Sequence, residues 1–145
     1  MTETGSMARR ASRFRDYAAL AVVGALVLLG IATAAESWHL AQQRKETVAS
    51  ALTGGDPQRA PALIRRYGCG GCHAISALNG ADGKVAAPLD DFRERVYIAG
   101  VVRNSPDNLI RWIVSPRTMS ARTAMPATGI TEREARDVAA FLYSH

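Results

Sequence analysis

Two cysteines and a histidine lie close together in the stretch Cys69-Gly70-Gly71-Cys72-His73. The spacing C-x-x-C-H is the attachment signature of c-type haem, in which each thiol adds to one vinyl group of the porphyrin. The histidine that follows lies under the iron and supplies a neutral imidazole as axial ligand. The two glycines remove side-chain bulk where the chain turns tightly against the ring. The pattern therefore predicts one covalently bound haem c.

Three other uses of a cysteine pair fit this sequence less well. A structural zinc site needs about four ligands, but the chain has two cysteines, and its other histidines, His39 and His145, are distant in sequence. A thioredoxin-type redox pair requires a βαβ context, and the sequence shows no such pattern. A disulfide between Cys69 and Cys72 would close too short a loop to stabilise the chain much.

Length, composition and charge agree with a small haem domain that carries an appendage. The 145 residues suffice for one domain plus an additional segment. Three phenylalanines, four tyrosines and two tryptophans make a thin aromatic core, so a buried haem would supply the large apolar body that the domain lacks. The formal net charge is +5, but acidic residues separate the basic ones, which argues against a nucleic-acid-binding surface.

An apolar segment without charged residues occupies residues 17–35 (YAALAVVGALVLLGIATAA). A helix of this length spans about 28 Å, close to the hydrocarbon thickness of a bilayer. Residues 1–16 before it are polar and basic. The positive-inside rule therefore places this tail in the cytoplasm and the C-terminal part on the opposite side of the membrane.

The competing interpretation of the N-terminal segment is a cleaved signal peptide. Ala32-Thr33-Ala34 fits a small-residue cleavage site, but the apolar core exceeds the roughly 7–15 residues usual for signal peptides. Arg9-Arg10 also resembles part of a twin-arginine signal, which we discount because haem is attached to unfolded chains after export. We favour a retained transmembrane anchor. A mature N-terminus at Ala35 or Glu36 would overturn this interpretation.

The remaining chain is expected to form a periplasmic tether and a compact domain. Residues 36–55 permit a helix until Thr53-Gly54-Gly55 breaks it. Residues 56–145 are expected to form the domain, with loops over 74–104 and 117–130. Capping and stop signals predict three helices there: from Asp56-Pro57 to about Tyr67, from Ser105-Pro106 to Pro116, and over residues 132–143 after a capping box that begins at Thr131.

The order of features over residues 56–145 resembles a class I cytochrome c. The similar features are a capped first helix, CGGCH, a loop with Pro88-Leu89, a helix bearing Trp112, a Met125-Pro126 loop and a final DVAAFL helix. The similarity is greatest to membrane-anchored monohaem cytochromes of bacterial respiratory chains, whose relatives accompany or are fused to haem-copper oxidases. It implies a mostly α fold of about three to four helices around the haem, with the first and last helices crossing. The crossing would involve Ala60, Ile64, Val138 and Phe141.

The resemblance also implies how the iron is held. A loop carbonyl accepts a hydrogen bond from the ligating histidine, and here the matching pair is Ala86-Ala87, or one residue later if Pro88 shifts the register. A thioether as sixth ligand raises the reduction potential. Met125 is the expected sixth ligand because it precedes a proline and the last helix, as in the family, whereas we interpret Met119 as core filler.

The haem propionates need hydrogen-bond donors, and guanidinium and indole groups can bind buried carboxylates. The candidates are Arg93, Arg95, Tyr97, Arg103 and Trp112. The exposed haem edge is expected to be ringed by a small apolar patch. Its expected members are Ala74, Ile75, Met125, Pro126 and Ala127.

A six-coordinate iron has no open site for a substrate, so the sequence predicts a non-enzymatic carrier of single electrons. The expected partners are a quinol–cytochrome c reductase or dehydrogenase upstream and a haem-copper oxidase downstream, with neither nucleic acid nor a small-molecule substrate. One alternative is a fixed haem c subunit of an oxidase or reductase complex, for which Gly24, Ala25 and Gly30 would allow close helix packing. A less favoured alternative is a haem sensor or enzyme with an open sixth site.

Overall fold

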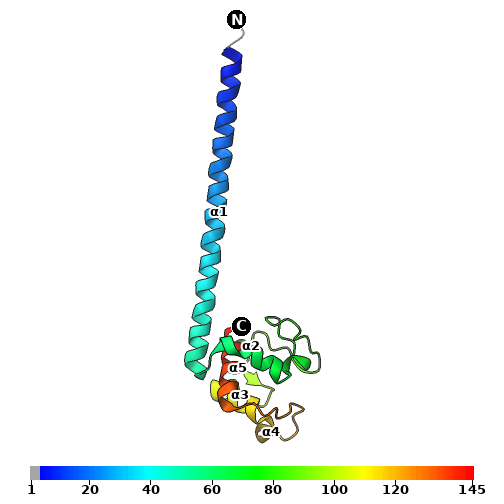
Figure 1. The fold of residues 1–145 in the computed structure, drawn as a ribbon. Helices are drawn as coiled ribbons and strands as arrows, with labels where there is room; N and C mark the ends of the chain where they lie inside the picture. Colours follow the sequence, from blue (N-terminus) through cyan, green and yellow to red (C-terminus); the bar gives the residue numbers. More distant parts are fainter. Residues whose placement is uncertain (1–3) are drawn as a thin grey trace. The chain divides into compact units, whose positions relative to one another are not determined.

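A computed structural model of the chain describes residues 4–145, which form helices, loops and one small hairpin (Figure 1). The helices are α1 (Thr4–Thr53), η1 (Pro57–Arg59), α2 (Ala60–Arg66), η2 (Cys69–Gly71), η3 (Phe92–Glu94), α3 (Pro106–Val114), α4 (Pro116–Met119) and α5 (Glu132–Ser144). The strands β1 (Tyr97–Ile98) and β2 (Val102–Arg103) pair antiparallel, with Tyr97 opposite Arg103. The prediction of a long apolar helix followed by a small, mostly helical domain is confirmed.

The chain divides into two units, residues Met1–Ala41 and Gln42–His145. The first unit contains most of α1, which is helical from Thr4, so the helix starts within the expected polar tail; residues 1–3 of that tail lie outside the described residues. One stretch of α1 is long and apolar enough to cross a membrane. All side chains from Leu20 to Ala41 are exposed. An exposed apolar surface on a helix of this length suits a lipid environment.

The last turns of α1 belong to the second unit. Ala49 and Thr53 are each only 1% exposed, and Gln42 donates from its side chain to the carbonyl oxygen of Ser144 (3.3 Å). Gly54, at a φ of +69°, ends the helix, and its N–H donates to the carbonyl oxygen of Ser50 (2.8 Å). The end of the expected tether is therefore packed into the compact unit.

Helix α5 is the centre of the second unit and packs against η1, α2, α3 and η3. Its side chains from Ala135 to Ser144 are buried, apart from the half-buried Arg136. The crossing of α2 and α5 agrees with the expectation drawn from the resemblance. The residues expected there, Ala60, Ile64, Val138 and Phe141, are all buried in one hydrophobic cluster.

The closest approach of two backbones at α5 occurs at Gly55. A Cβ atom on this residue would lie 2.1 Å from the carbonyl oxygen of Arg136 and 2.6 Å from the backbone nitrogen of Asp137. Real Cβ atoms do not come so near to backbone atoms, so only glycine fits here. The sequence indicated Gly55 only as part of a helix break, and its packing role was missed.

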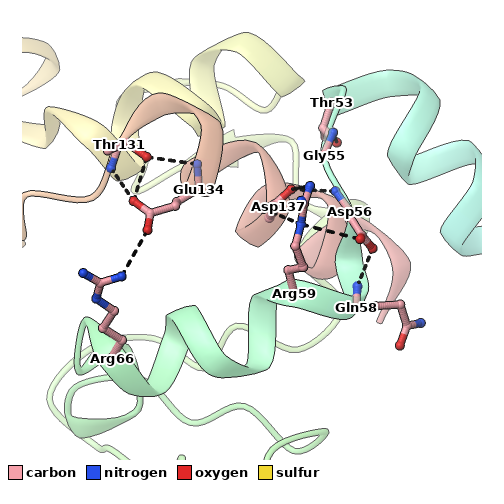
Figure 2. Close-up of polar contacts among 9 residues, drawn as sticks. All are labelled: Thr53, Gly55, Asp56, Gln58, Arg59, Arg66, Thr131, Glu134 and Asp137. Carbon is pink, nitrogen blue, oxygen red and sulfur yellow. Dashed lines mark hydrogen bonds and ion pairs between the residues drawn. The ribbon is translucent and has the colours of Figure 1, made fainter.

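A buried carboxylate ties η1 to α5 next to this contact (Figure 2). The Asp137 side chain is 5% exposed and accepts a hydrogen bond from the backbone N–H of Asp56 (2.7 Å). The guanidinium of Arg59 donates to both carboxylate oxygens, at 3.1 Å each. A buried charge is tolerated when it is paired and hydrogen-bonded in this way.

A second carboxylate, Glu134, joins the start of α5 to the end of α2 (Figure 2). Glu134 and Thr131 form the predicted capping box, and the hydroxyl of Tyr67 also donates to Glu134 (2.9 Å). Arg66 lies 3.5 Å from the same carboxylate. The hydrogen bonds from Thr131, and then that from Tyr67, lower the pKa of Glu134 to about 2. The bond to Glu134 also raises the pKa of Tyr67.

We expect this carboxylate to make stability depend on acid pH. The pKa of Glu134 is lower in the folded chain than its usual 4.5, so its contribution is complete above about pH 4.5 and is lost as the pH falls towards 2. Denaturation midpoints of wild type and Glu134→Gln, measured across this range, should converge as the pH falls. Glu132→Gln changes an exposed carboxylate in the same helical turn and should keep the wild-type profile. A constant difference between wild type and Glu134→Gln would contradict the assignment.

Candidate haem site

The C-x-x-C-H motif begins directly after α2. Gly68, at a φ of +70°, ends that helix, and the motif continues through η2. The N–H groups of Cys72 and His73 both donate to the carbonyl oxygen of Cys69 (3.2 and 3.0 Å). Both cysteines are free, Cys72 exposed and Cys69 half-buried, and burial raises the pKa of the Cys69 thiol. The fold thus presents two unpaired thiols within one turn.

Glycine is required at Gly70 because the chain packs there against Ala81. A Cβ atom there would lie 2.8 Å from the Cβ of Ala81 and 2.9 Å from its Cα. A Cβ atom on Gly71 would meet nothing within 4 Å. The motif turn is therefore packed against the loop that follows it, and this contact needs glycine at only the first of the two positions.

A cavity of about 280 Å³ lies beside the motif and is bordered by both predicted iron ligands, His73 and Met125. Cys72 borders it next to His73, and the loop from Thr123 to Pro126 contributes Met125. The remaining lining is mostly apolar and includes Leu89, Phe92, Ile98, Leu109, Trp112, Ile113 and Leu142. The fold thus brings His73 and Met125, which are far apart in sequence, to the same mostly apolar cavity.

The orientation of the His73 ring follows from its hydrogen bond. Its Nδ1 lies 2.7 Å from the carbonyl oxygen of Ala87. A carbonyl oxygen can only accept, so Nδ1 carries a proton, and in the neutral ring Nε2 is then the unprotonated nitrogen. This is the tautomer that binds a metal through Nε2. The acceptor is Ala87, so the register without the shift at Pro88 is the one observed.

The two loop methionines have different surroundings. Both are half-buried and pack against the hydrophobic cluster, but only Met125 lines the cavity. The backbone N–H of Met125 donates to the hydroxyl of Thr123 within the same loop (3.2 Å), whereas Met119 lies in α4. Neither His39 nor His145 borders the cavity, and the ring of His145 stacks on Phe141 at 4.1 Å.

The structure separates the five propionate candidates into two groups. Arg95 and Trp112 line the cavity, and Trp112 is 6% exposed. Arg93, Tyr97 and Arg103 are exposed and do not line it. One expectation about the neighbouring surface is wrong: Ile75 is 2% exposed and lies in the hydrophobic core, so it cannot ring an exposed edge.

The side chain of Asn104 joins the η3 region of the cavity wall to α5 by hydrogen bonds. The sequence did not indicate this role. The side-chain amide of Asn104 donates to the carbonyl oxygens of Phe92 and Arg95, at 2.9 Å each. Its oxygen accepts a hydrogen bond from the hydroxyl of Tyr143 (2.6 Å), and burial raises the pKa of this tyrosine to about 12. Asn104 therefore fastens two lining residues to α5.

The arrangement fits a covalently attached haem. The Cys72 thiol, the His73 imidazole and the Met125 thioether border one mostly apolar cavity. The free thiol of Cys69, three positions before Cys72, does not line the cavity and packs against the hydrophobic cluster. Within residues described by the structure, no three or more His, Cys, Asp or Glu side chains are grouped to hold a metal ion by themselves. The donor set therefore suits a porphyrin iron better than a zinc ion.

Comparisons with known proteins give two partial matches. The chain is 36% identical over 84 residues to cytochrome c oxidase subunit 2 of Alkalihalophilus pseudofirmus, covering 57% of this chain and 23% of that protein. It is 31% identical over 80 residues to cytochrome c oxidase subunit 2 of Bacillus sp. (strain PS3), covering 52% and 22% respectively. The matches thus span less than a quarter of these relatives. No family model and no solved structure matches the chain.

Proposed function

We propose that this chain is a membrane-anchored c-type cytochrome that carries single electrons between respiratory complexes on the periplasmic side of a bacterial inner membrane. The observation that carries the proposal is that His73 and Met125 border one apolar cavity beside the free thiols of Cys69 and Cys72. When bound, a haem supplies a one-electron Fe(III)/Fe(II) couple.

The residues of the chain would each contribute to that couple. Cys69 and Cys72 would hold the haem covalently, and His73 and Met125 would ligate its iron and so leave no place for a substrate. The apolar lining excludes water, and a thioether ligand raises the potential to the range of an electron carrier. Arg95 and Trp112 lie where they can donate to the propionates.

The similarity to oxidase subunits supports a haem-copper oxidase as electron acceptor. Both matched proteins are named cytochrome c oxidase subunit 2. A quinol–cytochrome c reductase or a dehydrogenase would be the donor. The apolar stretch of α1 would hold the cytochrome at the membrane, where a tethered carrier meets its partners at a high effective concentration.

The second candidate function is a fixed haem c subunit within an oxidase complex, since both matched proteins are themselves oxidase subunits. Purification in mild detergent separates the two functions. A fixed subunit would co-purify with the oxidase in constant ratio, whereas a mobile carrier would separate from it.

An optical spectrum of the isolated membrane fraction tests the proposed site. We expect a c-type spectrum on reduction and, in the oxidised form, the weak thioether-to-iron band at the red end. Carbon monoxide should leave the reduced spectrum unchanged because both axial positions are filled. Immediate binding of carbon monoxide, with no thioether band, would instead favour a sensor or enzyme with an open sixth site.

A further inference from the structure

Two loop segments, residues 73–76 and 87–90, each contribute lining residues to the cavity and are joined to each other by hydrogen bonds. The bonds are His73 Nδ1 to Ala87 O (2.7 Å), Leu89 N to Ala74 O (2.8 Å), Ser76 N to Asp90 Oδ1 (2.8 Å) and Ser76 Oγ to Asp90 Oδ2 (3.0 Å). The bond from His73 to Ala87, which orients the imidazole, is thus one of four hydrogen bonds between the segments. We refer to these four bonds together as the ladder. What fixes the ladder also fixes the imidazole.

Asp90 closes the far end of this ladder. Its carboxylate accepts from both the backbone N–H and the hydroxyl of Ser76, each oxygen taking one bond. A carboxylate makes stronger hydrogen bonds than a neutral acceptor, and two at once restrict the rotation of the side chain. The other bonds of the ladder end on backbone carbonyls. Asp90 is therefore the residue whose substitution can loosen the ladder without removing a ligand.

Arg95 also holds the segment formed by residues 87–90. Its guanidinium donates to the carbonyl oxygens of Pro88 and Asp90, the latter at 3.1 Å, and lies 5.0 Å from the ring centroid of Phe92. Residues 87–90 are thus held by hydrogen bonds both from Ser76 and from Arg95. Without the Ser76 contact, the segment keeps its position beside the cavity but can move relative to His73.

We propose that Asp90 is a positioning residue for His73 that tunes the haem potential through the Nδ1–H hydrogen bond to Ala87. This inference rests on the proposed function, because it assumes that His73 ligates the iron. A well-placed acceptor at Nδ1 makes the imidazole more basic and so favours Fe(III) over Fe(II). A looser ladder weakens that bond, which raises the reduction potential and exposes the Nδ1 proton to solvent.

The test uses the full-length holoprotein in mild detergent with Asp90→Ala. We expect the His73 Nδ1 proton, observed by NMR in the reduced form, to exchange with solvent about tenfold faster than in wild type. The midpoint potential should also rise, and a tenfold shift of the Fe(III)/Fe(II) equilibrium would appear as a rise of ~59 mV. The thioether band should remain, because Met125 is untouched. Asp90→Asn keeps an oxygen acceptor for Ser76 and should restore most of the wild-type values.

Two further variants keep the result interpretable. Glu94→Ala removes an exposed carboxylate four residues along the same loop that makes no hydrogen bond or ion pair with any described side chain, and it should match wild type. Ser76→Ala keeps the backbone donor and loses the hydroxyl, so it should shift both readouts in the same direction by a smaller amount. If Asp90→Ala does not fold, the exchange rate and potential of Ser76→Ala test the inference instead.

Wild-type exchange and potential in both Asp90→Ala and Ser76→Ala would overturn the inference. Loss of the proposed function would look different, because the wild-type holoprotein itself would then lack the thioether band or bind carbon monoxide. The two failures are therefore distinguishable from spectra of the wild type alone.

Discussion

Replacing Met125 with alanine is expected to abolish the thioether-to-iron band, convert the oxidised haem from low-spin to high-spin, and let carbon monoxide bind the reduced form. The side chain borders the cavity shared with His73, and alanine has no atom that can reach the iron. The cavity should then admit water or a small ligand at the sixth position. The potential should also fall, because a thioether favours Fe(II) over Fe(III).

Met119→Ala is the matched control for this experiment. Met119 lies in the same region of sequence but packs against the hydrophobic cluster and does not line the cavity. Its truncation should cost about 2 kcal/mol or less, because the side chain is only partly buried, and should leave the spectrum unchanged. Loss of the band in Met119→Ala, with its retention in Met125→Ala, would reverse the ligand assignment.

The parts of the site that the sequence predicted depend on short-range chemistry. The C-x-x-C-H spacing and the Thr131–Glu134 capping box each lie within a few residues. The capping box takes the expected form, and the C-x-x-C-H motif forms a tight turn. The helix starts at Asp56 and Ser105 are likewise local, and each of these side chains accepts a hydrogen bond from a backbone N–H of the following turn. Signals of this kind can be read without knowing the fold.

The residues that were missed act across the fold. Gly55 is set by the backbone of α5, and Asp90 and Asn104 each join loop segments that no periodic pattern relates. Ile75 was expected at an exposed edge, but it lies in the core. Such roles depend on which segments meet in space, which a single sequence does not reveal.

The continuity of α1 has a local explanation. The segment that follows the apolar stretch, residues 36–53, contains neither glycine nor proline, so nothing in it stops a helix that has already started. The helix ends only at Gly54. The expected anchor and tether are therefore successive parts of one helix: its side chains from Leu20 to Ala41 are exposed, and its last turns pack within the second unit.

Gly55→Ala is expected to destabilise the fold by about 3 kcal/mol or more, the upper end for overpacking. The added methyl would lie 2.1 Å from the carbonyl oxygen of Arg136 and 2.2 Å from its carbon. Both atoms belong to the backbone of α5, so no side-chain rotation can relieve the overlap. Residues around Gly55 must move away from the helix, which also strains the bond from the Asp56 N–H to Asp137 (2.7 Å).

The measurement is the guanidinium midpoint of the full-length holoprotein in mild detergent, followed by tryptophan fluorescence. Gly30→Ala is the control, since a Cβ there meets nothing within 4 Å and the residue lies outside the haem motif, and it should stay within about 0.5 kcal/mol of wild type. A packing effect at α5 would lower the midpoint of Gly55→Ala and leave that of Gly30→Ala unchanged. Equal stability of Gly55→Ala and wild type would show that the two backbones are not in contact as described.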